Sequence, residues 1–468
     1  MLFLFKRWAI GYSVILLLSV CLPASGARLL YGQDSEAGVG SELKSQVQND
    51  PYKLSFDDFE WSETANMRPV VGSKPVDDSI DLDAAIAIFR SRVSESTSAA
   101  ESVNLTELGK LLLKRAKTVD DLPAYAESEV ALRRAVELNE SYRPAKLALA
   151  QTLMARHGFK EALKLIQPLA ADTQTHAATL AALFDAELEL GHYGRAKDTL
   201  DRLILTERSA PVMARAARIA ELRGEHQLAL KHLHAAMEDL RDSGASGGKF
   251  AWYHWRIGSL NFDAGELDTA EEHFRRALEF SSGDEASLVG LARTQFAQGN
   301  VDQAIVSMRK AAAGEAPPVL ALFADMLAHQ GDESSALGLW DRTETLMREE
   351  AKVAKSAHAR EVSLFYADHK RNTKEAVALA KLDLQQREDA FAHDCYAWTL
   401  LNDDQIDKAD IAIRKALESV PHDNQILFHA AAIADAAGDQ HRAKTYAQQI
   451  RNPRFSVVHY KQLQRYLQ

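Results

Sequence analysis

The sequence predicts an all-α protein in which helix-turn-helix repeats stack into a solenoid. Three observations support this fold class. A glycine stands five residues before six of the ten members of a periodic series, where a helix would end. Only 7% of the residues are aromatic, which favours close helix contacts through small residues over a bulky core. The series itself is one small residue per repeat, at intervals of 34, 34, 33, 41, 34, 32, 40, 33 and 34 residues: Ser128, Ala162, Ala196, Ala229, Ala270, Ala304, Ala336, Ala376, Ala409 and Ala443.

The segment from Trp252 to Leu278 shows the repeating unit most clearly. It reads as two helices joined by a turn at Gly265, where glycine can adopt the left-handed conformation that ends a helix. Ala270, Phe274 and Ala277 follow at helical spacing and give the second helix a small-large-small face. Such a unit cannot bury its apolar face alone, so neighbouring units must stack on it.

Residues 1–27 have the features of a secretory signal peptide. Lys6 and Arg7 precede an apolar run of 15 residues, and small residues follow it up to Ala27. The run is shorter than the about 20 residues that span a bilayer. An uncleaved membrane anchor is the alternative. Cleavage after Ala27 would leave Cys395 as the one remaining cysteine, so the mature chain would form no intramolecular disulfide.

The rest of the chain divides into four predicted parts. Residues 28–80 are rich in Gly, Ser, Asp, Glu and Pro without apolar periodicity, which predicts a flexible acidic linker. Residues 81–102 hold one amphipathic helix, which we expect to cap the first repeat, and a Ser/Ala/Glu-rich break. The ten repeats occupy 103–452. Residues 453–468 predict a last helix with the polar face that the water-exposed end of a solenoid needs.

Two long intervals interrupt the repeat period. The first contains the glycine-rich stretch 242–249, which we interpret as a loop between repeats. Its GASGG sequence fits the hydrolase pattern G-x-S-x-G, but that motif requires a preceding strand and here a helix is predicted. The second long interval, through 348–355, predicts one extended helix of mixed charge.

The charge and the residue spacing argue against nucleic-acid binding and against catalysis. The formal charge of −11 would become −13 without residues 1–27, which hold two basic and no acidic residues, and an acidic chain repels phosphates. No two of the sixteen histidines are three or four residues apart, and HExxH and CxxC motifs are absent from the sequence. We therefore expect no catalytic residues, no cofactor and no metal site, with a site assembled across several repeats as the alternative.

A helix-turn-helix period of 34 residues resembles the tetratricopeptide repeat. The resemblance covers about 350 residues in ten copies, and its specificity lies in the repetition. The chain departs from the family pattern at two places. Leu180, Met213, His254, Leu288 or Leu320 replaces the early tryptophan, and the proline that closes the second helix appears only as Pro421. Pentatricopeptide repeats are the alternative family, although the acidic charge disfavours their RNA-binding role.

The resemblance implies a right-handed superhelix whose concave face is lined by the first helix of each repeat. Aromatic residues and arginines in such a groove are typical of peptide-binding hot spots. The alternative for Trp252 and Trp255 is that they cover the junction beside the glycine-rich loop. The repeat register predicts these groove residues: Arg218, Trp252, Trp255, Phe262, Arg293, Phe296, Phe365 and Trp398.

The sequence thus predicts a non-enzymatic scaffold that holds a peptide or another protein in the groove of a tetratricopeptide superhelix. The signal predicts an exported protein, periplasmic or secreted, most consistent with a bacterial cell envelope. Membrane contact is expected only through an uncleaved signal anchor. The alternatives are an enzyme or metal-binding protein with a site built across repeats, and a structural solenoid that self-assembles through its ends.

Overall fold

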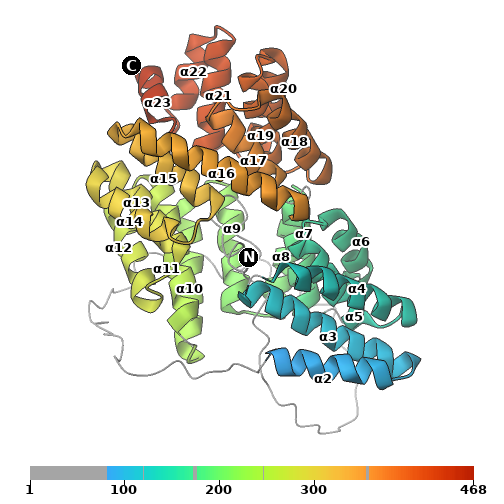
Figure 1. The fold of residues 1–468 in the computed structure, drawn as a ribbon. Coiled ribbons are helices and arrows are strands. Elements are labelled where there is room, and N and C mark those ends of the chain that lie inside the picture. The colour runs from blue at the N-terminus through green and yellow to red at the C-terminus, as the bar shows by residue number, and fades with distance from the viewer. Residues whose placement is uncertain (1–81, 120, 172–175, 246, 355–357) are drawn as a thin grey trace, which may run out of the picture. The chain divides into compact units, whose positions relative to one another are not determined.

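The computed structural model describes residues 82–468, apart from 120, 172–175, 246 and 355–357. The predicted signal at 1–27 and the predicted linker at 28–80 lie outside the described residues. Within the described residues the chain is helical and contains no strand (Figure 1). None of the helices in this part of the chain combines the length and the apolar character needed to cross a membrane.

The helices follow one another with short connections. In chain order they are α2 (Leu82–Glu95), α3 (Ser98–Val119), α4 (Leu122–Leu138), α5 (Arg143–Ala155), α6 (Phe159–Ala170), α7 (Ala177–Glu189), α8 (Tyr193–Thr206), α9 (Ala210–Leu222), α10 (His226–Asp242), α11 (Gly247–Ala264), α12 (Leu267–Phe280), α13 (Glu285–Gln298), α14 (Val301–Ala312), α15 (Pro317–Gln330), α16 (Glu333–Ala354), α17 (Ala359–Asp368), α18 (Thr373–Gln386), α19 (Ala390–Asn402), α20 (Ile406–Ser419), α21 (Asn424–Ala436), α22 (Gln440–Ala447) and α23 (Tyr460–Leu467).

Helices α3 to α22 pair into ten successive hairpins, as the repeat period predicts. Each of the ten periodic small residues lies on the second helix of its hairpin, and each is at most 1% exposed. A small side chain is required there because the first helix of the same repeat packs directly against it. The predicted fold class, an all-α solenoid of stacked helix-turn-helix repeats, is confirmed.

The repeat at α11–α12 shows why small residues are needed between neighbouring helices. Phe274 of α12 is 1% exposed and fills the space between α11 and α13. A Cβ atom added at Gly258 of α11 would lie 2.9 Å from its ring, and one added at Gly290 of α13 would overlap the ring. One large residue is therefore accommodated by glycines on both sides.

The turns inside the hairpins follow the glycine pattern. All six predicted turn glycines are left-handed, with φ from 74° at Gly224 to 100° at Gly331. One turn differs. The residue five positions before Ala376 is Arg371, but Lys370 and Asn372 adopt positive φ there, at 51° and 44°. A left-handed non-glycine residue costs roughly 1–2 kcal/mol, so this turn is locally strained.

Two predicted irregular stretches are shorter than expected. The first helix, α2, packs on α3 through Ile86, but α3 already begins at Ser98, so the predicted break before the repeats shrinks to 96–97. Ser102 lies inside α3 and donates a hydrogen bond to the carbonyl of Ala135, which stabilises the longer helix. The glycine-rich loop is also shorter, since α11 begins at Gly247. The second long interval is the extended helix α16, as predicted.

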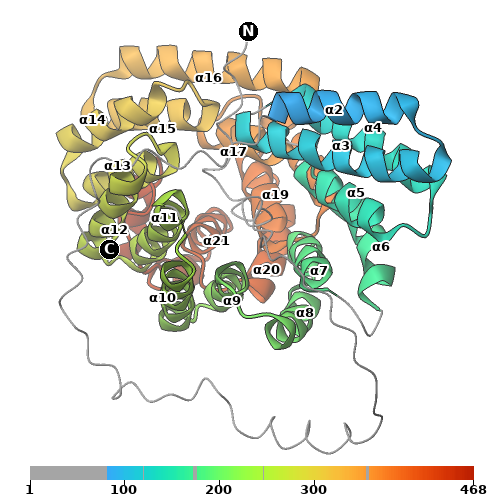
Figure 2. The same ribbon diagram turned by 90° about the horizontal axis from the view of Figure 1, so that it is seen from below.

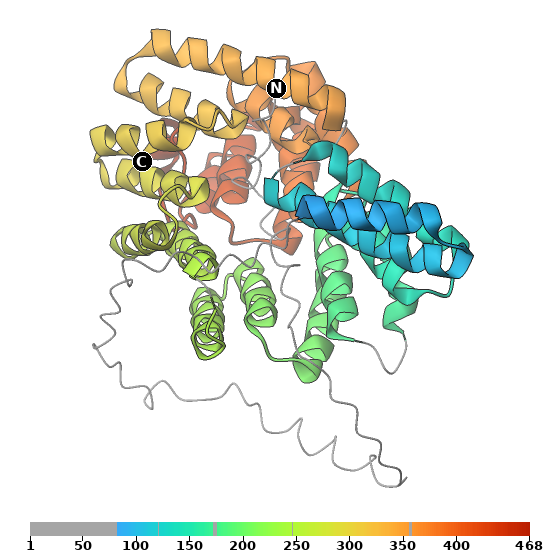
Figure 3. The same cartoon turned by 60° about the horizontal axis from the view of Figure 1, so that its bottom comes forward.

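The chain turns back on itself, so that late repeats contact the turns of early repeats. Arg387 Nη1, beside the start of α19, lies 3.1 Å from Glu189 Oε2 at the end of α7. The turn after α7 must approach closely, because a Cβ at Gly191 would lie 2.8 Å from the Cα of Asp389. In Figures 2 and 3 the C-terminal helices (orange to red) lie among the helices of the middle repeats (green to yellow).

The segment between α22 and α23 completes this contact. Asn452 Nδ2 donates to the carbonyl of Phe262 in α11 at 2.7 Å, and Arg454 donates to the carbonyl of Ala297 in α13 at 3.0 Å. Helix α23 then buries Leu463 and Tyr466 in the core that contains residues of α11, α12 and α21. The C-terminal segment is therefore packed along the inner side of the middle repeats.

Candidate functional site

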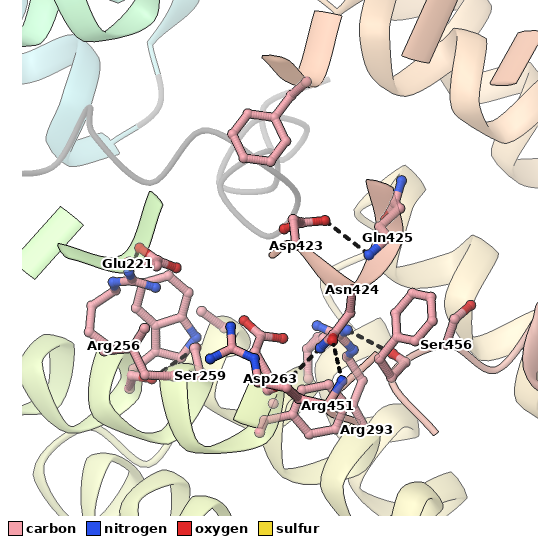
Figure 4. Close-up of a pocket in the computed structure, with 18 of the residues that line it drawn as sticks. Glu221, Arg256, Ser259, Asp263, Arg293, Asp423, Asn424, Gln425, Arg451 and Ser456 are labelled. Atoms are coloured by element: carbon pink, nitrogen blue, oxygen red, sulfur yellow. Dashed lines mark hydrogen bonds and ion pairs between the residues drawn. The ribbon is translucent and has the colours of Figure 1, made fainter. Parts of the chain in front are cut away.

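A cavity of about 350 Å³ lies where the first helices of the middle repeats face the C-terminal part of the chain (Figure 4). Helices α9, α11 and α13 form one wall. The connection before α21, the beginning of α21 and the segment 451–458 form the other. The cavity therefore exists only because the chain turns back, and its walls come from segments about 160–190 residues apart.

One side of the cavity carries a buried group of three charges. Glu221 Oε2 lies 2.8 Å from Arg218 Nη1 and 2.6 Å from Arg256 Nη2. Burial by itself would raise the pKa of Glu221, but the two guanidinium groups outweigh it and lower the pKa to about 2. The side chains of Arg218 and Glu221 keep 18% and 19% exposure, so solvent reaches this group.

The pKa of Asp263, at the end of α11, is shifted in the opposite direction. Burial raises its pKa to about 7, while Arg293 lowers the pKa and the negative charges of Asp423 and Glu221 raise it further. Within the described residues, no hydrogen bond or ion pair reaches its carboxylate. Asp263 is therefore an acceptor that changes charge near neutral pH and, in the described part of the chain, has no partner.

The facing wall is held by hydrogen bonds from the C-terminal repeats. Asp423 caps α21 by accepting from the backbone N–H groups of Gln425 and Ile426. Asn424 Nδ2 donates to the carbonyl of Asp263 at 2.7 Å, and Asn424 Oδ1 accepts from the N–H of Arg451 at 3.0 Å. These hydrogen bonds connect the start of α21 to α11 and to the segment that begins at Arg451.

Arg293 of α13 connects the two walls. Its guanidinium lies over the ring of Phe262, 4.5 Å from the ring centre, and donates to the carbonyl of Phe455 at 3.0 Å. Within the described residues, its guanidinium makes no other hydrogen bond, and Arg293 lines the cavity. Arg218 lies similarly over Phe391 of α19, at 5.5 Å.

Four of the eight predicted groove residues line this cavity, and four do not. Arg218, Trp255, Phe262 and Arg293 are lining residues. The other four pack elsewhere: Trp252 against Tyr253, Phe296 against His329, Phe365 against His369, and Trp398 against His429. Three of those four, Phe296, Phe365 and Trp398, are at most 5% exposed, which leaves a ligand little surface.

Sequence reasoning missed much of the cavity. Glu221 could have been found, since it follows Arg218 by three residues on one helix and therefore shares its face. The other missed residues, Asp263, Asp423, Asn424 and Arg451, enter the site through contacts between distant repeats, for which the sequence holds no local signal.

Comparison with known proteins finds a matching family model for one part of the chain. The family model described as "Tetratricopeptide repeat" matches residues 261–315, from the end of α11 through α14. The ten equivalent hairpins form a solenoid of tetratricopeptide-like repeats, and the family match falls on one part of it. Scaffolds of this class typically mediate protein–protein interaction and are generally non-enzymatic. No curated protein sequence matches the chain.

Among solved structures, the chain is similar to yeast Tom70, with 12% identity over 82% of this chain and 95% of that one and a TM-score of 0.33. It is also similar to the human IFIT1 dimer with PPP-AAAA, with 11% identity, 80% and 90% coverage and a TM-score of 0.42. A TPR repeat-containing protein from Cytophaga hutchinsonii matches with 14% identity, 60% and 98% coverage and a TM-score of 0.34.

Proposed function

We propose that this protein is a non-enzymatic scaffold that binds a protein partner through a short peptide segment held in the central cavity. The observation that supports this proposal is that two charged side chains face the cavity without a full set of hydrogen-bond partners. Asp263 offers an unpaired acceptor, and Arg293 offers donors beyond its bond to Phe455. Both side chains are partly exposed to the cavity, and polar groups that converge in a cavity without full pairing are typical of a ligand site.

The size of the cavity limits the ligand. About 350 Å³ is at the small end of the roughly 300–1,000 Å³ typical of ligand sites. The C-terminal repeats cover the inner face where an extended peptide would otherwise lie. The proposed ligand is therefore a loop tip or chain end of the partner that inserts a few residues, instead of a long peptide along the whole groove.

The charges define the chemistry of that segment. Arg293 suits a carboxylate, because a guanidinium can donate two parallel hydrogen bonds to it. Asp263 suits backbone or side-chain N–H groups, and Phe262 and Trp255 supply apolar contact area. An acidic side chain or a C-terminal carboxylate next to free amide N–H groups would satisfy both sides of the cavity.

Crosslinking in the native host tests this proposal. A photo-reactive residue replaces Ser259, which lines the cavity, and in a control chain it replaces Leu205, which is 84% exposed. We expect one specific adduct from position 259, absent from position 205, and lost when Asp263→Asn is added. An adduct that Asp263→Asn leaves unchanged, equal adducts from both positions, or none from position 259 would contradict the proposal.

We also propose that the protein acts outside the cytoplasm, in a bacterial cell envelope or secreted form. The support is the basic-apolar-small pattern of residues 1–27. Fractionation of cells that express the full chain, with sequencing of the mature N-terminus, tests it. Recovery in the exported fraction with a new N-terminus near residue 28 is expected, and full-length chain in the cytoplasmic fraction would contradict it.

A further inference from the structure

Three side chains from distant parts of the sequence meet beside the central cavity. Asp368 is the last residue of α17, His429 lies in α21, and His459 directly precedes α23. Each offers one possible metal-ligand atom, and these atoms all lie within 4.8 Å of one another. Two imidazoles and one carboxylate form a ligand set that suits zinc and other divalent transition metals.

The distance between two of these groups is compatible with shared coordination of one ion as well as with an ion pair. His459 Nε2 lies 3.3 Å from Asp368 Oδ1. Charge-assisted hydrogen bonds between nitrogen and a carboxylate are shorter, at about 2.7–2.9 Å. Two ligands of one tetrahedral ion, with bonds of about 2.0–2.1 Å, are separated by about 3.4 Å.

His429 supplies the second, independent observation. Its side chain is fully buried, and Asp394 Oδ1 lies 2.8 Å from Nδ1. Within the described residues, the other nitrogen, Nε2, has no hydrogen-bond partner. A buried imidazole nitrogen without a partner requires an explanation. A carboxylate that holds one nitrogen and leaves the other for an ion is the arrangement seen around histidine ligands of metals.

The surroundings hold all three side chains in place. Trp398 Nε1 donates to Asp368 Oδ1 at 2.7 Å, and the Trp398 ring stacks on His429 at 4.2 Å. The ring of Phe428 stacks on His459 at 4.4 Å. Because aromatic rings and hydrogen bonds already fix the rotamers, little ordering would remain to oppose binding of an ion.

We propose that Asp368, His429 and His459 form a binding site for one divalent transition-metal ion of the zinc class. Asp394 orients His429, and Trp398 orients Asp368. Bound metal connects the C-terminal segment to α17 and α21, and thereby stabilises the wall of the central cavity, which Asp368 also lines. Three protein ligands leave a fourth position for water or a ligand group. This site does not depend on the identity of the protein partner.

Zinc binding to the metal-free full chain, purified without a histidine tag, tests the site. Competition with a chromophoric chelator gives the stoichiometry and affinity, and thermal unfolding with and without Zn²⁺ gives an independent readout. We expect one ion per chain and a rise in Tm that a chelator reverses. Absence of saturable binding at one equivalent would overturn the proposal.

Variants separate this site from other histidines. His429→Gln and His459→Gln should each weaken zinc binding about 100-fold or more, since second-shell changes alone typically cost about 10–100-fold. Asp368→Asn serves where a histidine variant fails to fold, because it keeps an acceptor for Trp398. The matched control is His254→Gln, since His254 and His273 form another close pair, with Nδ1 atoms 3.1 Å apart. Loss of binding in His254→Gln, or its retention in folded Asp368, His429 or His459 variants, would overturn the proposal.

Discussion

Two buried groups of charges in this protein contrast in how completely they are paired. The first joins α17, α18 and α7. Arg360 bonds to Asp383 and Asp389, each at 2.7 Å, while Arg387 bonds to Asp383 at 2.8 Å and to Glu189 at 3.1 Å. The second lines the central cavity, where Glu221 is shared by two arginines but the carboxylate of Asp263 has no partner within the described residues.

The difference indicates different roles for similar chemistry. In the first group every charge meets its opposite, and both arginine side chains are at most 3% exposed, so the group holds distant repeats together. In the second group the pairing is incomplete and solvent has access. Complete pairing is typical of a structural connection, and incomplete pairing in a cavity is typical of a binding site.

We expect the largest loss of stability from a substitution in the first group of charges. Arg387→Leu leaves Asp383 and Glu189 with less compensation in a buried site, and breaking a buried pair in this way costs about 3–5 kcal/mol. The free energy of unfolding, measured with urea, checks this. The control is Arg348→Leu, whose side chain is 53% exposed and whose ion pair with Glu344 should contribute less than about 1 kcal/mol. Equal losses in both variants would show that the first group is not the structural connection.

We expect a smaller loss of stability when Glu221, the paired carboxylate of the cavity, is replaced. Folding lowers the pKa of Glu221 from its usual value of 4.5 to about 2. The charge of Glu221 therefore stabilises the fold above pH 4.5, and this contribution disappears as the pH falls toward 2. Glu221→Gln should therefore cost about 2–3 kcal/mol at pH 7 and little at pH 2. Urea unfolding at several pH values measures the difference. A loss that does not shrink in acid would argue against the ion pairs as its cause.

Replacing Asp263, the unpaired carboxylate, should change the stability in the opposite direction. The pKa of Asp263 rises from 3.8 to about 7 on folding, so the folded chain binds the proton more tightly and stability is lost as the pH rises from about 4 to 7. Asp263→Asn should stabilise the fold by about 3–4 kcal/mol at pH 8 and have almost no effect at pH 3. The same variant should lose the partner, because it removes the acceptor charge. Destabilisation at pH 8 would contradict the view that Asp263 is kept for binding.

The local architecture was determined by the sequence alone. The ten periodic small residues, the six left-handed glycines and the extended helix α16 were all predictable, since they depend on contacts within one hairpin or with its neighbour. The same periodicity placed Arg218, Trp255, Phe262 and Arg293 on the inner face, where they line the cavity. Their role in binding stays a prediction.

Only the tertiary structure decided how the repeats meet across the superhelix. Small rotations between successive repeats accumulate until α19, α21 and the C-terminal segment contact α7 to α13, and no single repeat encodes the sum of those rotations. Asp263 and Asn424, 161 residues apart, therefore meet where the two walls of one cavity come together. Asp368, His429 and His459 converge for the same reason, although no histidine spacing in the sequence indicated a metal site.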